Sequence, residues 1–346
     1  MKNHGNEGFP LSRREALAIA AGSVSALLGP ELAESVSAEA AKTRRFDVVI
    51  VGGGPAGLSA GLVLGRACRR VLICDSGHGR NAPAAAVHGF LTQDGTPPAE
   101  LRRIGREQLN PYDVALHDGT VTDAKKVEGG FEVTLDDTEV VACRKLILAT
   151  GLADGLPEIP GLKEFWGDSI ILCPYCHGWE FKGQSWSFIA APEDVIESAT
   201  LLLGWTKRLS LLTNGPVDLP AATRDWLSNR SIEVLQERIE RLEGDDGKLK
   251  AIRFERGRRL QCSVLYLRSR FRQASNLAEK LGCELIESGF TAGMVKTDPM
   301  SVTRVEGVYV IGDASAGPPS VASAVAEGSM AAGAANRAML IEDAGS

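Results

Sequence analysis

The sequence has no excess of positive charge and no long apolar run. Its 346 residues include 38 lysines and arginines against 44 aspartates and glutamates, for a formal net charge of −6. Because nucleic-acid binding needs at least a basic patch or stripe, this balance gives no sign of a nucleic-acid partner. Since no run of 18 or more apolar residues occurs, no segment is predicted to span a membrane.

The seven cysteines are too few and too scattered for a fold held together by disulfides. Only Cys173 and Cys176 form a close pair. The others lie in apolar or strand-like surroundings and are predicted to be small buried side chains. They are Cys68, Cys74, Cys143, Cys262 and Cys283.

The first forty residues have the pattern of a targeting signal. Two arginines at 13–14 precede a weakly apolar stretch over 16–28, and 38–40 (AEA) fits a cleavage site. The paired arginines after Ser12 resemble a twin-arginine signal, although Ala16 stands where that motif usually has Phe. Residues 1–40 are therefore predicted to send the protein to the periplasm or outside the cell. If they are instead an amphipathic N-terminal helix, the protein is cytoplasmic.

A dinucleotide-binding turn follows the signal. The apolar run 46–51 (FDVVIV) predicts a buried parallel strand, and it leads directly into 52–57 (GGGPAG) and a helix to about residue 67. Gly52 allows the tight turn, Gly54 lets a pyrophosphate approach the backbone, and Gly57 lets helix and strand pack closely. A glycine-rich loop is the alternative, but a second strand, 71–74, ends at Asp75, where a carboxylate can bind ribose hydroxyls.

Two later segments complete a cofactor domain. The strand 308–311 (VYVI) ends in Gly312 and Asp313, and a helix of small residues is predicted from about 319 to 338. The strand 146–149 (LILA) ends in Thr150 and Gly151. Together these motifs resemble the FAD domain of thioredoxin reductases and related disulfide reductases.

This resemblance implies a bound FAD and a homodimer. It implies that Asp313 holds the ribityl chain of FAD, and that the backbone at Val321 and Ala322 points toward the flavin ring. Arg80 and Asn81 and the segment around His88 fall where family members line the flavin. The residues assigned to the cofactor are Gly52, Gly54, Pro55, Ala56, Gly57, Asp75, Asn81, His88, Thr150, Gly151, Gly312, Asp313, Val321 and Ala322.

The segment 173–177 (CPYCH) predicts a redox-active dithiol. Two cysteines three residues apart at a helix start are close enough to form a disulfide, and the helix N-terminus and a nearby proton donor favour the thiolate. The alternative, half of a zinc site, lacks a second Cys or His pair at suitable spacing, so no metal is predicted.

The position of this pair resembles that of the active disulfide in low-molecular-weight thioredoxin reductases. The resemblance implies that Cys176 faces the flavin and that Cys173 exchanges with the substrate. His177 stands where thioredoxin reductases have an Asp, and Cys-x-x-Cys-His is the variant of the dithiol oxidases of the gliotoxin and holomycin pathways. Histidine both takes and gives a proton near neutral pH. The alternative is that His177 is a solvated helix residue.

A second dinucleotide turn has lost its glycines. After the strand 186–189, the family's G-x-G-x-x-A turn reads 190–195 (AAPEDV). Pro192 removes one amide donor, and Glu193 and Asp194 place negative charge where phosphates would bind. This segment is therefore predicted not to bind a nicotinamide, although weak binding by another route stays open.

We therefore expect an α/β fold with a three-layer ββα FAD-binding Rossmann-like domain, residues 42–156 and 268–343, interrupted by a smaller Rossmann-like domain, residues 157–267. The predicted function is an FAD-dependent dithiol oxidase that acts on a small-molecule or peptide dithiol and passes electrons to O₂ to give H₂O₂. The alternatives are a disulfide reductase supplied by NAD(P)H or a partner protein, and an exported flavoprotein that binds thiols or partners without turnover.

Overall fold

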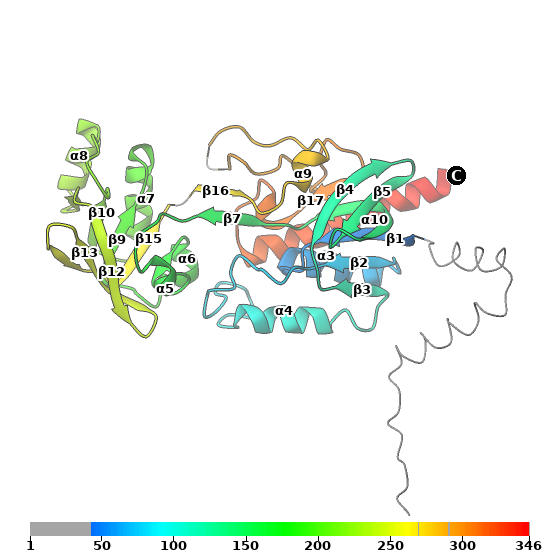
Figure 1. Ribbon diagram of the computed structural model, residues 1–346, viewed down its shortest axis with the longest axis horizontal. Coiled ribbons are helices and arrows are strands. Elements are labelled where there is room, and N and C mark those ends of the chain that lie inside the picture. Colours follow the sequence, from blue (N-terminus) through cyan, green and yellow to red (C-terminus); the bar gives the residue numbers. More distant parts are fainter. Residues whose placement is uncertain (1–42, 269, 290, 346) are drawn as a thin grey trace, which may run out of the picture. The chain divides into compact units, whose positions relative to one another are not determined.

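The computed structural model describes residues 43–268, 270–289 and 291–345. The predicted signal peptide, residues 1–40, lies outside the described residues. The chain has the predicted α/β fold (Figure 1). Within the described ranges no helix is long and apolar enough to cross a membrane.

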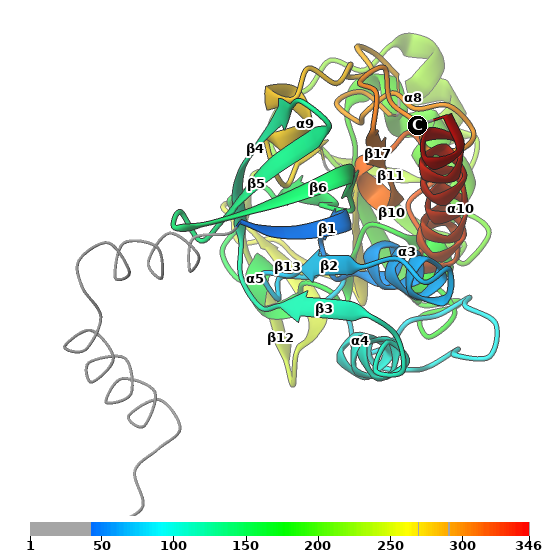
Figure 2. The ribbon, with the colours of Figure 1, turned by 90° about the vertical axis from the view of Figure 1, so that its right-hand side faces the viewer.

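The first sheet has seven strands in the order β3-β2-β1-β6-β5-β4, with β17 also paired to β6. Alternate residues of β1 point to opposite faces, as the strand period of two requires. Val48 and Ile50 pack with α3 and α10, and Val49 and Val51 pack with β4, β5 and β6. Figure 2 shows α3 and α10 lying together beside the sheet. These elements are β1 (Arg44–Val51), α3 (Pro55–Arg66), β2 (Val71–Cys74), α4 (Pro98–Glu107), β3 (Val114–His117), β4 (Val121–Val127), β5 (Gly130–Leu135), β6 (Glu139–Leu148), α9 (Leu277–Lys280), β17 (Val308–Val310) and α10 (Val321–Gly345).

The second sheet has five strands in the order β11-β10-β9-β15-β8. Trp186 and Phe188 on β9 pack against α7 and α8, while Leu265 and Leu267 on β15 pack against a three-stranded sheet, β12-β13-β14. The five-stranded sheet therefore has helices on one face and a small antiparallel sheet on the other. The elements are α5 (Leu162–Phe165), β8 (Ile170–Ile171), α6 (Pro174–His177), β9 (Ser185–Ile189), α7 (Val195–Leu202), β10 (Arg208–Leu212), α8 (Ala221–Ser228), β11 (Glu233–Leu235), β12 (Ile239–Asp245), β13 (Lys248–Phe254), β14 (Arg259–Gln261) and β15 (Val264–Leu267).

The chain passes between the two sheets through one antiparallel pair of strands. It leaves the seven-stranded sheet along β7 (Leu152–Gly155) and returns along β16 (Arg270–Gln273), and Asp154 pairs with Phe271 between them (Figure 1). Residues 156–268 therefore form one continuous insertion in the chain that builds the first sheet.

Two expectations from the sequence need correction. The C-terminal helix was expected to end near residue 338, but α10 continues to Gly345, because the segment beyond 338 contains no proline to stop it. Cys68 was expected to be buried, yet it is exposed. It follows the end of α3 with φ +59°, and the amides of Cys68 and Arg69 bond back to the carbonyls of Gly65 and Leu64. This is a Schellman-type helix end, in which the left-handed residue points away from the core.

Candidate functional site

The glycine turn after β1 leaves room for a phosphate group. Gly52 has φ +115°, and a Cβ at Gly52 or at Gly57 would overlap a backbone carbonyl oxygen, that of Ala149 or that of Gly52. A Cβ at Gly54 would instead meet nothing within 4 Å. Helix α3 begins at the next residue, Pro55, without a side-chain cap or an acidic residue in its first turn. Free amides and a positive helix end thus face open space, which fits the pyrophosphate of FAD.

Asp75 follows the carboxyl end of β2, beside this turn. Its Oδ2 lies 2.5 Å from Nη2 of Arg102, and its Oδ1 accepts a hydrogen bond from the amide of Gly77 at 3.1 Å. Burial raises the pKa of Asp75, but the Gly77 and Gly53 amides and the positive charge of Arg102 outweigh burial and lower it. Asp75 is therefore an ionised acceptor, held in place at the position where the ribose of a dinucleotide lies in Rossmann folds.

The Thr150-Gly151 and Gly312-Asp313 turns follow adjacent strands, because β17 pairs in parallel with β6 up to Leu148. Gly312 has φ +68° and Gly151 has φ +70°. The carboxylate of Glu327 on α10 accepts hydrogen bonds from the Gly312 amide at 2.8 Å and from the Ser315 hydroxyl at 2.6 Å. The sequence motifs did not include Glu327, which fixes the turn that carries Asp313.

Arg80 joins this turn to the strand that leaves the first sheet. Its Nε and Nη2 donate to the two oxygens of Asp154 on β7 at 2.9 and 2.6 Å, and its Nη1 donates to Oδ2 of Asp313 at 2.9 Å. A planar guanidinium satisfies both carboxylates at once. Asn81 lies on the neighbouring turn, half-buried, and its carbonyl accepts a hydrogen bond from Ala84. Val321 and Ala322 open α10, where Ser320 accepts a hydrogen bond from the Ser323 amide.

Cys173 and Cys176 form a disulfide at the start of the short helix α6. Cys173 is the N-cap residue, and its Sγ accepts a hydrogen bond from the Cys176 amide at 3.2 Å. This amide stabilises negative charge on Cys173 when the disulfide opens. The remaining described cysteines are free. Burial raises the pKa of the Cys143 thiol to about 12 and that of Cys262 to about 11, so these two thiols are inert at neutral pH.

His177 ends α6 with its ring facing a cavity of about 330 Å³. Both ring nitrogens are buried, and neither makes a hydrogen bond of good geometry within the described structure, although the Cys173 carbonyl lies close enough to affect the ring. Burial lowers the pKa of His177, and the nearby His88 lowers it further, while Glu180, Asp168 and the Cys173 carbonyl act in the opposite direction. The ring is thus neutral near pH 7, with one free lone pair and one free N–H beside the disulfide.

The other walls of this cavity come from four further parts of the chain, at 85–88, 167–168, 248–250 and 263, and from Glu180, Phe181 and Gln184 after α6. Asp168 contributes Oδ1, which is also buried and without a hydrogen-bond partner in the described residues. Nε2 of His88 lies 3.6 Å from Oε1 of Glu180, and its Nδ1 lies 3.4 Å from Oδ1 of Asp94. Sequence patterns did not identify Glu180 and Asp168 as site residues. The spacing of Glu180, three residues after His177, was an available signal, whereas Asp168 had none.

Two ion pairs lie at the altered second dinucleotide turn, residues 190–195. Residues Pro192–Asp194 form a short 3₁₀ helix before α7. Arg268, which follows β15, places Nε 3.3 Å from Oδ2 of Asp194 and Nη2 3.1 Å from Oε2 of Glu197. Carboxylates and a guanidinium therefore occupy the end of α7 at which a dinucleotide would present its phosphates.

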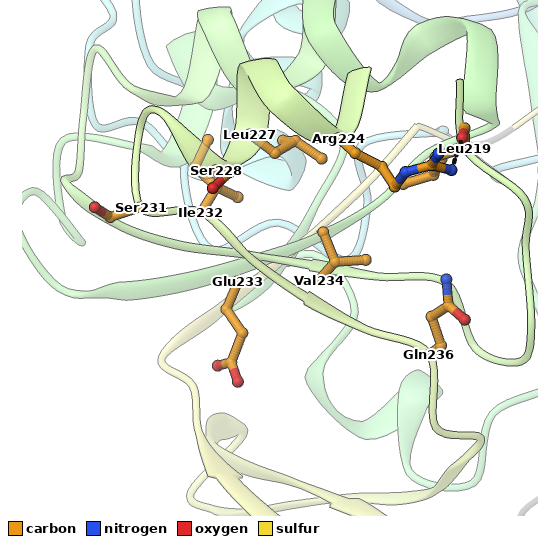
Figure 3. Close-up of a pocket in the computed structure, with 9 residues that line it drawn as sticks. All are labelled: Leu219, Arg224, Leu227, Ser228, Ser231, Ile232, Glu233, Val234 and Gln236. Atoms are coloured by element: carbon orange, nitrogen blue, oxygen red, sulfur yellow. Dashed lines mark hydrogen bonds between the residues drawn. The ribbon is translucent and has the colours of Figure 1, made fainter. Parts of the chain in front are cut away.

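A second cavity, of about 480 Å³, lies between α8 and β11 (Figure 3). Its nine lining residues include no cysteine and no histidine, and Arg224, its one cationic side chain, bonds to the carbonyl of Leu219 and pairs with Asp218. His177, the residue that follows the cysteine pair, lines the cavity of about 330 Å³ and not this one. Among the described residues, no group of three or more His, Cys, Asp and Glu side chains could hold a metal ion.

Comparisons with known proteins agree with this arrangement. The chain is 33% identical over 313 residues to the protein named thioredoxin reductase tcpT of Claviceps purpurea, covering 86% of this chain and 95% of that one. Among solved structures, HlmI superposes with a TM-score of 0.82 at 34% identity, covering 88% of this chain and 96% of that one. An oxidoreductase from Agrobacterium tumefaciens superposes with a TM-score of 0.79 at 38% identity, covering 86% and 99%.

The family model described as pyridine nucleotide-disulphide oxidoreductase matches residues 46–195 and 208–328, which is most of the chain. The thioredoxin reductase-like members of this family are FAD-binding flavoproteins, and the open glycine turn at Gly54 fits that cofactor. The chain therefore belongs to the pyridine nucleotide-disulphide oxidoreductase family and is a thioredoxin reductase-like, FAD-dependent enzyme.

Proposed function

We propose that the protein is a dithiol oxidase: electrons enter through the Cys173–Cys176 disulfide and leave to O₂ as H₂O₂. The observation that carries this proposal is the second dinucleotide turn, where Arg268 pairs with Asp194 and Glu197 in place of a phosphate-binding glycine loop. An enzyme of this family without a nicotinamide site needs another electron donor. The disulfide beside a buried, neutral histidine offers an entry point for a thiol substrate.

The first half of the reaction uses His177 and Cys173. A substrate thiol gives its proton to the free lone pair of His177, and the resulting thiolate attacks Sγ of Cys173. The Cys173–Cys176 bond breaks, and Cys176 leaves as a thiolate. The second substrate thiol then gives its proton to the Cys176 thiolate and attacks the substrate sulfur of the mixed disulfide. The oxidised substrate leaves, and the Cys176 amide stabilises the Cys173 thiolate.

The second half restores the disulfide. FAD, when bound, supplies the two-electron acceptor for the reduced cysteine pair and passes the electrons to O₂. The residues that would hold it are the glycine turn at 52–57, Asp75, and the turns at 150–151 and 312–313. Each turnover thus moves two electrons and two protons from the dithiol to O₂.

The decisive experiment is an anaerobic titration of the purified flavoprotein. Dithiothreitol should bleach the oxidised flavin absorption near 450 nm, NADPH and NADH should not, and air should restore the absorption with release of peroxide. Rapid bleaching by NADPH, with none by dithiothreitol, would overturn the proposal. Cys176→Ser should abolish the bleaching by dithiothreitol. Any bleaching that remains in this variant measures the direct reduction of flavin by dithiothreitol.

The second candidate is a disulfide reductase fed by NAD(P)H or by a partner protein. It is favoured by one observation, that two relatives covered over 95% and 94% of their length are named thioredoxin reductases. The same titration separates the two, because a reductase of this kind takes electrons from the nicotinamide or the partner and delivers them to a disulfide.

We also propose export through the twin-arginine-type segment at 12–17 and assembly as a homodimer. Export of a folded flavoprotein would place the enzyme where NADPH is not supplied, which agrees with the altered second turn. Cell fractionation with Arg13→Lys/Arg14→Lys as the control tests export. Light scattering of the holoenzyme, with an expected mass near twice the 36.7 kDa of one full chain, tests the dimer.

A further inference from the structure

A proton that His177 accepts has to leave a buried site. Both ring nitrogens are buried, and neither makes a hydrogen bond of good geometry within the described structure. A base that takes a proton from each substrate molecule has to release that proton before the next turnover. The ring shares the cavity of about 330 Å³ with titratable groups that reach solvent.

A chain of titratable side chains leads from this cavity to solvent. Glu180 lines the cavity with a side chain that is 43% exposed, and its Oε1 lies 3.6 Å from Nε2 of His88. The other ring nitrogen of His88 lies 3.4 Å from Asp94, whose side chain is 68% exposed. His88 itself is 26% exposed, and it lies between two carboxylates that reach water, one of which lines the same cavity as His177.

We propose that Glu180 and His88 form a proton relay that carries protons between His177 and solvent. The proposal rests on the proposed function, because it assumes that His177 accepts the thiol proton. One proton moves from the substrate sulfur to a ring nitrogen of His177, then to Glu180 and His88, and leaves through Asp94. The same groups return a proton to the active site when O₂ is reduced.

The charges around the relay are suited to this role. Asp168 lines the same cavity, and with Glu180 it stabilises a protonated His177. Lys248 and Lys250 from β13 also line the cavity, and Lys250 pairs with Asp245 at 3.4 Å. The cavity therefore gathers two carboxylates, two imidazoles and two lysines, so both proton donors and proton acceptors surround the ring of His177.

The alternative explanation of the His88–Glu180 pair is that it only holds two loops together. A structural pair would change stability without changing proton transfer. The test therefore needs a measurement that responds to protons, and a control histidine–carboxylate pair elsewhere in the chain. His117 supplies that control, since its side chain is 25% exposed and its Nε2 lies 2.8 Å from Asp136, outside the cavity.

The experiment measures the rate of anaerobic flavin reduction by dithiothreitol between pH 5.5 and 9 for the FAD-loaded wild type, His88→Gln, Glu180→Gln and His117→Gln. We expect the first two variants to slow reduction about 10-fold or more below pH 8, to regain rate with added imidazole, and to show a larger solvent isotope effect than the wild type. His117→Gln should match the wild type throughout.

Unchanged pH profiles in both Glu180→Gln and His88→Gln, with the wild type still reduced by dithiothreitol, would overturn the relay alone. A wild type that dithiothreitol does not reduce would overturn the proposed function itself. Because His88 is also predicted to line the flavin, FAD affinity and the flavin spectrum are recorded for each variant. If His88→Gln loses FAD, Glu180→Gln decides the outcome.

Discussion

Arg268 and Asp194 are joined by an ion pair of 3.3 Å at the position where a nicotinamide enzyme keeps its phosphate-binding turn. Arg268 also donates its backbone amide to the Ile189 carbonyl, so its side chain starts beside the end of β9. The side chain of Arg268 is only 15% exposed. A dinucleotide phosphate would have to displace two carboxylates from this cation and would then face the same carboxylates unpaired.

We therefore expect no stabilisation of the holoenzyme by NADPH or NADH. A ligand at 100 times its Kd stabilises a native protein by about 2.7 kcal/mol, which shifts the melting temperature by several degrees. Thermal melting with millimolar NADPH should show no shift, whereas adding FAD to the apoprotein should raise the melting temperature. A shift with NADPH that disappears in Arg268→Ala would show that the cation binds the nucleotide, contrary to this expectation.

Cys173→Ser and Cys176→Ser should both abolish dithiol-dependent flavin reduction, yet they should differ in what they trap. With Cys176 replaced, the Cys173 thiolate should attack an added small disulfide such as oxidised glutathione, release one glutathione thiol and keep the mixed disulfide, because no internal thiol resolves it. Mass spectrometry of the intact protein measures this adduct. Cys68→Ser, which removes an exposed thiol outside the site, should keep full activity. An equal adduct on both variants would contradict the assignment of Cys173 as the exchanging sulfur.

His177 should make the protein sensitive to acid. Its pKa lies below the ordinary 6.5, mainly because burial disfavours the charged ring. The unfolded state therefore binds more protons than the folded state as pH falls below 6.5, and stability is lost from that pH down to the lowered pKa. Urea unfolding between pH 7.5 and 5 should show a smaller loss of free energy for His177→Gln than for the wild type. Parallel curves for the two proteins would contradict this prediction.

Two glycines of the first turn should respond differently to alanine. Gly54→Ala should fold normally, because the new Cβ meets nothing within 4 Å, yet it should weaken FAD binding by about 1–3 kcal/mol, since the methyl group enters the space left for the pyrophosphate. Gly57→Ala should lower stability even without FAD, because its Cβ would overlap the Gly52 carbonyl. Apoprotein melting and FAD titration separate the two effects. Similar melting temperatures for both apoproteins would contradict the assignment.

Local sequence patterns were sufficient where one short segment carries a whole function. The glycine turn at 52–57 lies between a buried strand and a helix, so the sequence alone placed β1 and α3 to within two residues. The pair Cys173 and Cys176 was identified by spacing alone, because three residues of a helix start bring two sulfurs within bonding distance. Cys68 was assigned wrongly because a helix end, not apolar surroundings, decides its exposure.

The sequence by itself thus determined the strand–glycine–helix turns, the cysteine pair and the loss of glycines at 190–195, because each depends on neighbours along the chain. Only the tertiary structure decided what surrounds them. Arg80 reaches Asp154 and Asp313, Arg268 reaches Asp194, and His88 reaches Glu180 across separations of 74 to 233 residues. No local pattern encodes such contacts, because they arise when the sheets bring the ends of separate strands and loops together.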